Sequence, residues 1–274
     1  MNDTTIAFIG GGNMATSLIG GMTEKGFSTG AIRVSDPVEE SRRRLEKQFG
    51  VATVDDNREA CRNADVVVLA VKPQVMKEVV AGFADALAHR PLVISIAAGI
   101  PMAALQAWLG ADKPIVRCMP NTPSLVQAGA SGLYASDGVS DTQKTLATEI
   151  LDAVGMTVWL ESEDDLDAVT AVSGSGPAYF FLLMEAMEKA GTELGLNPET
   201  ARRLTLQTAL GAAKMAHQSD VDPAELRRRV SSPGGTTERA VATFVEAGLP
   251  ELVARAMTAA RDRSRQMAEE LTRN

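Results

Sequence analysis

One run of residues constrains the fold more than any other: Val66–Val71 is apolar at every position. A strand with one face in water alternates apolar and polar side chains, so a run without alternation indicates a strand that is covered on both faces. Such strands occur in parallel sheets built from βαβ units. The run therefore predicts an open, doubly wound parallel sheet.

The rest of the first half repeats this pattern. Short β-branched runs alternate with helical stretches as far as Leu160, which is typical of βαβ units. The predicted strands are Thr5–Ile9, Ala31–Ser35, Asp65–Val71, Leu92–Ile96, Pro114–Cys118 and Met156–Trp159. We expect residues 1–162 to form an α/β domain of the Rossmann type.

The second half, residues 163–274, is predicted to be an all-α domain, because its apolar residues recur at spacings of three and four. Asn197 and Asp222 precede prolines that suit a first helical turn, and they are predicted N-caps. The segment Pro177–Leu194 is too apolar for a helix with a solvent face, which indicates a homo-oligomer. The predicted helices are Asp164–Val172, Pro177–Leu194, Pro198–His217, Pro223–Val230, Thr236–Ala247 and Pro250–Thr272.

Composition excludes several classes of protein. With 45% hydrophobic and 23% charged residues, the 274-residue chain has the composition of a globular protein. Its net charge of −8 argues against a nucleic-acid partner. Without a leader-like start or 18 consecutive apolar residues, we expect a cytoplasmic protein with no membrane partner. Two cysteines and two histidines are too few for a disulfide framework or a zinc site, so no metal is expected.

A glycine-rich turn follows the first predicted strand. Residues 10–15, Gly-Gly-Gly-Asn-Met-Ala, match G-x-G-x-x-A between a strand and a helix. In that motif Gly10 permits the tight turn, Gly12 lets the backbone approach a pyrophosphate, and Ala15 allows close packing of helix and strand. A glycine turn without a ligand is the alternative. The strand–turn–helix context favours a dinucleotide site, in which the helix N-terminus holds the phosphates.

The dinucleotide's identity depends on the end of the second strand. Asp36 stands where a residue contacts the adenosine ribose, and a carboxylate there favours the free 2′-hydroxyl of NADH. Ser35 and three arginines would instead favour the 2′-phosphate of NADPH, although a solvated helix face is the preferred interpretation of the arginines. These are Arg42, Arg43 and Arg44.

Two later strand ends offer further cofactor contacts, since ligands of open α/β sheets bind beyond the carboxyl ends of the strands. Lys72 follows one such end, where a cofactor contact and a plain surface charge are equally plausible. Residues 97–99, Ala-Ala-Gly, follow the next and are small enough to admit a flat nicotinamide ring.

A second glycine turn lies in the helical half. Residues 231–237 read Ser-Ser-Pro-Gly-Gly-Thr-Thr, and the two glycines let successive N–H groups point at one place before a helix begins. Such a nest binds anions, with Gly235, Thr236 and Thr237 as the expected contacts. An ordinary turn between helices is the alternative, and the pattern alone favours it.

These motifs, together with Met119–Pro123 (Met-Pro-Asn-Thr-Pro) and Ser173–Tyr179 (Ser-Gly-Ser-Gly-Pro-Ala-Tyr), resemble the pyrroline-5-carboxylate reductases over nearly the whole chain. The resemblance implies reduction of the ring C=N of pyrroline-5-carboxylate to proline, the last step of proline biosynthesis. It implies NADPH as the hydride donor, with NADH as the alternative. It also implies an interlocked homodimer, a decamer as the larger assembly, and active sites formed between chains.

The same resemblance assigns individual residues. For the substrate it assigns Glu163, Ser232, Gly234, Gly235, Thr236 and Thr237. For the cofactor it assigns Gly10, Gly12, Asn13, Met14, Ala15, Asp36, Asn57, Val71, Lys72, Pro73 and Ala98. Thr237 is the expected catalytic residue, its hydroxyl bonding to the ring nitrogen. A cyclic imine that arrives protonated needs little acid–base machinery, which agrees with the scarcity of histidine.

Two other functions stay open at this point. A reductase could act on a related cyclic imino acid or on a small hydroxy or keto acid, but such hydroxyacid dehydrogenases carry a lysine on the first interdomain helix. The matching stretch after Gly176 has none and offers only Tyr179 as a proton donor. A non-catalytic NAD(P)-binding protein is the third possibility, for which a second anion site has no evident use.

Overall fold

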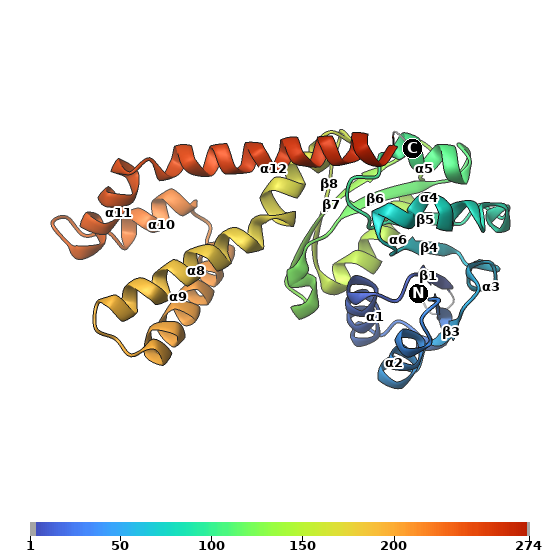
Figure 1. Ribbon diagram of the computed structural model, residues 1–274, viewed down its shortest axis with the longest axis horizontal. Helices are drawn as coiled ribbons and strands as arrows, with labels where there is room; N and C mark the ends of the chain where they lie inside the picture. The colour runs from blue at the N-terminus through green and yellow to red at the C-terminus, as the bar shows by residue number, and fades with distance from the viewer. Residues whose placement is uncertain (1–3, 273–274) are drawn as a thin grey trace. The chain divides into compact units, whose positions relative to one another are not determined.

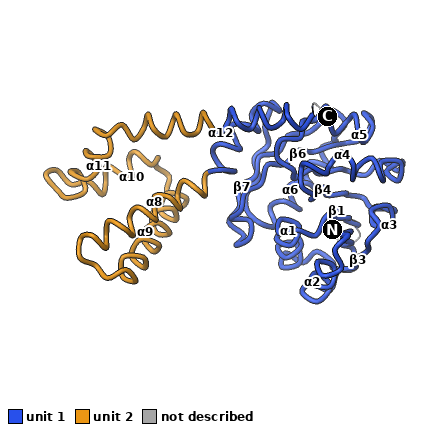
Figure 2. Tube along the Cα trace, viewed as in Figure 1, with its two compact units in different colours: residues 1–175, 260–274 blue, residues 176–259 orange. Residues whose placement is uncertain are grey.

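The computed structural model describes residues 4–272. The chain divides into two compact units, coloured separately in Figure 2: one extends to Ser175 and includes the chain again from Ala260, and the other is Gly176–Ala259. The predicted domain limit after residue 162 stays a prediction, because these units are defined by contacts within one chain and need not coincide with domains.

The first unit is built on one eight-stranded sheet (Figure 1), with the strand order β3-β2-β1-β4-β5-β6-β7-β8. All neighbouring strands are parallel except β6 and β7. This confirms the predicted doubly wound sheet, which is mostly parallel: β7 and β8 run antiparallel to the other six strands, a reversal that the sequence did not predict. The strands are β1 (Ile6–Ile9), β2 (Ile32–Ser35), β3 (Ala52–Val54), β4 (Val66–Leu69), β5 (Leu92–Ser95), β6 (Ile115–Met119), β7 (Gly129–Ala135) and β8 (Gly155–Trp159).

Two hydrophobic cores lie on opposite faces of this sheet. Along β4, Val66 and Val68 belong to one core and Val67 and Leu69 to the other, and all four are fully buried. Helices α1 (Asn13–Glu24), α2 (Glu39–Phe49) and α6 (Asp141–Leu151) supply the first core. Helices α3 (Asn57–Cys61), α4 (Pro73–Ala81) and α5 (Met102–Leu109) supply the second. The unbroken apolar run in the sequence is therefore explained as predicted: the strand is covered on both faces.

Two strands, β3 and β7, were not predicted. β3 is a three-residue edge strand with partly exposed side chains, so it carries no apolar signal. β7 reads Gly-Ala-Ser-Gly-Leu-Tyr-Ala and lacks β-branched residues. Its glycines have a packing reason: a Cβ on Gly129 would lie 2.9 Å from the carbonyl oxygen of Val154, and a Cβ on Gly155 of the neighbouring β8 would lie 2.1 Å from the carbonyl oxygen of Gly129. Close approach of neighbouring strands selected residues whose β propensity is low.

The second half is helical, as predicted. Its helices are α7 (Asp165–Val169), α8 (Gly176–Glu193), α9 (Pro198–Gln218), α10 (Pro223–Arg229), α11 (Thr236–Glu246) and α12 (Leu249–Thr272), and α8 packs against α9. Asn197 and Asp222 are confirmed as N-caps, since their side chains accept hydrogen bonds from the N–H groups of Thr200 and Glu225. One predicted helix differs in form: after α7 the chain continues as a π-helical turn, Thr170–Gly174.

Large apolar side chains cover the surface of the second unit. Phe180 and Phe181 of α8 are 65% and 62% exposed, and leucines and methionines on α8 and α9 are similarly open. Soluble single chains rarely expose apolar areas of this extent unless another molecule covers them. Within residues 4–272, no helix has the length and apolar character needed to cross a membrane.

Both cysteines are predicted to be unreactive in the folded protein. Cys61 and Cys118 are free and buried. Burial raises the pKa of each thiol to about 12; the charge of Asp56 adds to the rise at Cys61, whereas a hydrogen bond with Ser131 opposes it at Cys118. Because a thiol must lose its proton to react, a thiol reagent at about pH 8 should label the denatured chain at both cysteines and the native chain at neither.

The same raised pKa values predict how stability depends on pH. The folded chain keeps these two protons above the ordinary thiol pKa of 9.0, at which the unfolded chain loses them. The free energy of unfolding should therefore retain their contribution below about pH 9 and lose it between about pH 9 and pH 12. For the labelling experiment of the preceding paragraph, reaction of the native chain at about pH 8 would contradict the burial of these two thiols.

Candidate active site

The glycine turn between β1 and α1 has the geometry that a dinucleotide requires. Gly10 has φ +100°, and a Cβ there would lie 2.7 Å from the carbonyl oxygen of Ala70, so only glycine suits this position. At Gly12, by contrast, a Cβ would meet nothing within 4 Å among the described residues beyond its chain neighbours. The backbone is therefore tight at Gly10 and open at Gly12, where the motif needs room for a pyrophosphate.

The start of α1 can hold a negatively charged group. Gly12 is the N-cap, no side chain in residues 4–272 caps the helix, and its first turn carries no acidic residue. Asn13 is exposed, Met14 is half-buried, and Ala15 is buried in the core between helix and sheet. Unpaired N–H groups and the positive end of the helix dipole thus fit the phosphates of a dinucleotide.

Asp36 lies directly after β2 and fastens the glycine turn. Its Oδ2 accepts a hydrogen bond of 2.8 Å from the N–H of Gly11, and its Oδ1 accepts one of 2.8 Å from the N–H of Val38. These two bonds fix the carboxylate at the edge of the turn, where the adenosine ribose is expected. Its backbone-bound position was not evident from the sequence.

The three arginines of α2 differ in their roles. Arg43 is mostly exposed and pairs with Glu39, as expected for a solvated helix face. That interpretation is wrong for Arg42, whose side chain is 18% exposed, whereas Arg44 is exposed as expected but also binds backbone. Arg42 donates to the carbonyl oxygen of Asp36 at 2.7 Å, and Arg44 donates to that of Gly11 at 3.0 Å. Both therefore brace the turn, because their guanidinium groups bind its backbone.

The remaining predicted cofactor residues lie at the same edge of the sheet. Asn57 begins α3 after β3, Ala98 follows β5, and three residues follow β4: Val71, Lys72 and Pro73. Since β3, β2, β1, β4 and β5 are adjacent and parallel, the segments that follow them meet at one edge. The topology thus brings together residues that the sequence scatters between Gly10 and Ala98.

The second glycine turn already holds a carboxylate. Gly234 has φ +70°, and its N–H donates to Oε2 of Glu238 at 2.7 Å. Helix α11 begins with Gly235 as its N-cap and has no side-chain cap in the described chain. The turn brings together five of the predicted substrate residues: Ser232, Gly234, Gly235, Thr236 and Thr237. Its contact with Glu238 indicates that this backbone can bind a carboxylate.

Glu163, the sixth predicted substrate residue, lies in the first unit between β8 and α7. Its Oε1 accepts a hydrogen bond of 2.6 Å from the N–H of Met102 and a short ion-paired bond from Arg117. Arg117 was not singled out from the sequence. A signal was present, because a lone arginine between the apolar residues of Ile115–Met119 is unusual in a buried strand.

Two further motifs of the family resemblance touch one another. The side chain of Asn121, 8% exposed, donates to the carbonyl oxygen of Ser173 at 3.1 Å and accepts from the N–H of Ala130 at 2.9 Å. A Cβ on Gly174 would lie 2.6 Å from Cε of Met119. The loop after β6 therefore packs on the π-helical turn that leads to α8.

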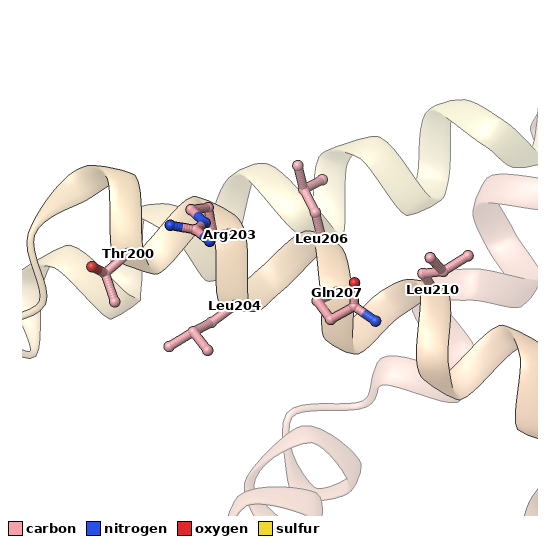
Figure 3. A pocket seen from close by; sticks show the side chains of 6 residues that line it. All are labelled: Thr200, Arg203, Leu204, Leu206, Gln207 and Leu210. Atoms are coloured by element: carbon pink, nitrogen blue, oxygen red, sulfur yellow. The ribbon is translucent and has the colours of Figure 1, made fainter.

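A pocket in the second unit contains none of the predicted site residues. Figure 3 shows it along α9, lined by Thr200, Arg203, Leu204, Leu206, Gln207 and Leu210. Leucines supply half of these residues, and Leu204, Leu206 and Leu210 are each more than 40% exposed. This pocket is part of the exposed apolar surface and not of the chemistry described above.

Two family models match the chain: pyrroline-5-carboxylate reductase dimerisation over residues 163–267, and NADP oxidoreductase, coenzyme F420-dependent, over residues 5–99. A pyrroline-5-carboxylate reductase of Pseudomonas aeruginosa is 58% identical over 271 residues, which cover 99% of each chain. The chain belongs to the pyrroline-5-carboxylate reductase family. The family resemblance noted in the sequence is thereby confirmed.

Solved structures of the pyrroline-5-carboxylate reductase family support the fold over the full length. The enzyme of Coxiella burnetii is 46% identical, with a TM-score of 0.95 over 97% of this chain and 99% of that one. A pyrroline carboxylate reductase of Plasmodium falciparum with NADP bound is 30% identical, with a TM-score of 0.86 over 98% and 99%. The predicted combination of a Rossmann sheet and a helical region is confirmed.

The helical region matches the dimerisation model of the pyrroline-5-carboxylate reductase family, which indicates that this chain self-associates. The exposed apolar side chains of α8 and α9 agree with that assignment. The roles of individual site residues are not decided by family membership and stay predictions.

A pair of glycine substitutions should separate cofactor binding from folding. In Gly12→Val the new side chain meets open space, so we expect only a small fall in melting temperature, because valine is a poorer N-cap than glycine. The NADPH Kd should rise by about 10-fold or more, since the side chain occupies the phosphate approach. Gly10→Ala places a Cβ against Ala70 at positive φ and should cost about 1 to 3 kcal/mol of stability or more. Titration calorimetry and urea unfolding measure the two effects. Wild-type NADPH affinity in Gly12→Val would contradict the assignment of the turn.

Proposed function

We propose that this protein is a pyrroline-5-carboxylate reductase that converts pyrroline-5-carboxylate to proline with NAD(P)H, the last step of proline biosynthesis. The observation that carries the proposal is its full-length match to a relative of that name at 58% identity. The two backbone cradles support it, since one is open to a pyrophosphate at Gly12 and the other binds a carboxylate at Gly234.

The cofactor half of the proposal rests on the glycine turn. Gly10, Gly12, Asn13, Met14 and Ala15 hold the pyrophosphate; Asp36 lies at the adenosine ribose; and Asn57, Val71, Lys72, Pro73 and Ala98 line the rest of the cofactor. When bound, the dinucleotide supplies the hydride. We propose NADPH as the donor, supported by the match to an NADP oxidoreductase model, with NADH as the alternative that the Asp36 carboxylate favours.

The substrate half rests on the turn before α11. Gly234, Gly235, Thr236 and the Ser232 hydroxyl bind the substrate's carboxylate, in the way that the N–H of Gly234 now binds Glu238. The Thr237 hydroxyl bonds to the ring nitrogen and orients the C=N bond. Glu163, which belongs to the first unit, is a further residue that we propose for substrate binding. Because the protonated imine accepts hydride directly, these residues act by orientation and electrostatics.

The assembly proposal follows from the helical region. We propose that residues 1–162 form the dinucleotide domain and residues 163–274 the substrate and dimerisation domain, that two chains interlock, and that dimers assemble further into a decamer. The match of the dimerisation model to residues 163–267 supports the limit. Hydride transfer requires the substrate bound by one chain to meet the nicotinamide bound by that chain or its partner.

We also propose that the protein acts in the cytoplasm on a small molecule, with no nucleic-acid or membrane partner. Its net charge of −8 is unsuited to phosphate backbones. Two free, buried thiols suit a reducing compartment.

An absorbance assay of cofactor oxidation tests the function. Purified protein should consume NADPH when pyrroline-5-carboxylate is added, with proline formed in equal amount, and should be assayed with NADH in parallel. Small keto acids should give no turnover, because the stretch directly after Gly176, Pro177–Leu182, carries no lysine to serve as a proton donor. Turnover with a keto acid, or none with pyrroline-5-carboxylate, would reject the proposal.

Thr237→Ala tests the catalytic assignment. Loss of one hydroxyl that bonds to the ring nitrogen should lower kcat by about 10-fold to 1000-fold, with an unchanged circular dichroism spectrum and melting temperature. Thr243→Ala is the matched control, because this hydroxyl lies on the same helix and, within residues 4–272, donates to the carbonyl oxygen of Arg239 in its own helix. Equal kinetics for both variants would remove Thr237 from the mechanism.

A further inference from the structure

A charged side chain lies within the sheet where the mechanism above does not use it. Arg117 projects from β6 between Val116 and Cys118, which are buried, and its own side chain is only 14% exposed. In register it lies beside Ser95 at the end of β5. A guanidinium this far removed from water requires a partner, and the Glu163 carboxylate supplies it through a short ion-paired hydrogen bond.

The same carboxylate caps a helix from a distance in the sequence. Helix α5 begins at Met102, and its N-cap residue, Pro101, makes no side-chain cap. The Met102 N–H instead donates to Oε1 of Glu163 at 2.6 Å. A negative charge at a helix N-terminus is stabilising, so Glu163 does for α5 what a local cap does elsewhere. Glu163 thus joins α5 to β6 through one oxygen atom.

This junction fixes the ends of the turn from β5 to α5. The turn holds Ala97 and Ala98, the residues expected beside the nicotinamide, and Gly99 at φ +73°. Its first end is the hydrogen-bonded strand β5 and its second end is the start of α5. Ile100 within the turn is 1% exposed and cannot move without disturbing the core. A shift of the α5 start would therefore displace the small residues of the turn.

We propose that Arg117 is a positioning residue of the reductase reaction: acting through Glu163, it fixes the start of α5 and hence the turn that would hold the nicotinamide ring. This inference rests on the proposed function. Arg117 touches neither substrate nor cofactor in this role. Its removal should disturb the geometry of hydride transfer more than the affinity for the dinucleotide, most of whose contacts are at the glycine turn.

The test compares Arg117→Met, Arg117→Lys and Glu163→Gln in the full-length protein. Arg117→Met should lower kcat by about 10-fold to 100-fold, as expected for a small misplacement of the reacting groups, while the Kd for NADPH changes less than about threefold. Arg117→Lys keeps the charge and should recover most of the activity. The double variant Arg117→Met, Glu163→Gln should be no slower than Arg117→Met, since both act through one contact.

Arg90→Met is the matched control. Arg90 forms an ion pair with Asp112 near the opposite, amino-terminal ends of β5 and β6, and it is more than half exposed. Its loss should leave kcat unchanged. Melting temperatures of all variants show whether a lower kcat is due only to a smaller amount of folded protein.

The inference is overturned by a wild-type kcat in Arg117→Met, or by additive effects of the Arg117 and Glu163 changes. Because Glu163 is also a proposed substrate residue, its change to Gln is expected to raise the KM for pyrroline-5-carboxylate; that rise together with a wild-type kcat in Arg117→Met would make Arg117 a structural residue. Failure of the proposed function looks different, since the wild-type protein itself would then show no turnover. Emission of bound NADPH reports the nicotinamide environment without turnover, and an identical spectrum in Arg117→Met and wild type would also reject the role.

Discussion

The close approach of the Gly10 backbone to β4 is the constraint on which the nucleotide-binding half depends. The N–H of Gly10 donates to the carbonyl oxygen of Ser35 at 2.8 Å, and the N–H of Ala70 donates to that of Ile9 at 2.8 Å. The turn is therefore tied to the strand ends on both sides. A side chain at Gly10 would collide with Ala70 and separate them. Because the turn cannot move, the start of α1 and the open space at Gly12 occupy one defined place at the sheet edge.

Polar side chains at this edge of the sheet bind backbone N–H groups. Their positions are thereby fixed, which suits the ligand-binding roles proposed for them. Asp36 binds the N–H groups of Gly11 and Val38, and Glu163 binds that of Met102. Each carboxylate thereby stabilises a turn and stands where the family resemblance expects a ligand. A carboxylate held by backbone donors has little orientational freedom left to lose when a ligand binds. It can therefore orient a ligand at low entropic cost.

The helical half is stabilised differently. Its α8 and α9 pack together, yet Phe180 and Phe181 stay mostly exposed within one chain. Removal of such surface from water is favourable by about 25 cal/mol per Å². Self-association therefore follows from the same residues that make up the dimerisation match. For such a region, stability and assembly depend on the same contacts.

The sequence by itself determined the parallel sheet, the glycine turn, the helical second half and the caps at Asn197 and Asp222, because periodicity, turn residues and caps act between neighbours in the chain. Only the tertiary structure decided the strands β3 and β7, the bracing by Arg42 and Arg44, and the link from Arg117 through Glu163 to Met102. These depend on contacts between segments far apart in sequence, such as the small residues that let Gly129 and Gly155 meet. A local pattern can mark a residue, as the lone arginine in an apolar strand marks Arg117, but it does not give the residue's partner, which depends on the packing of the whole sheet.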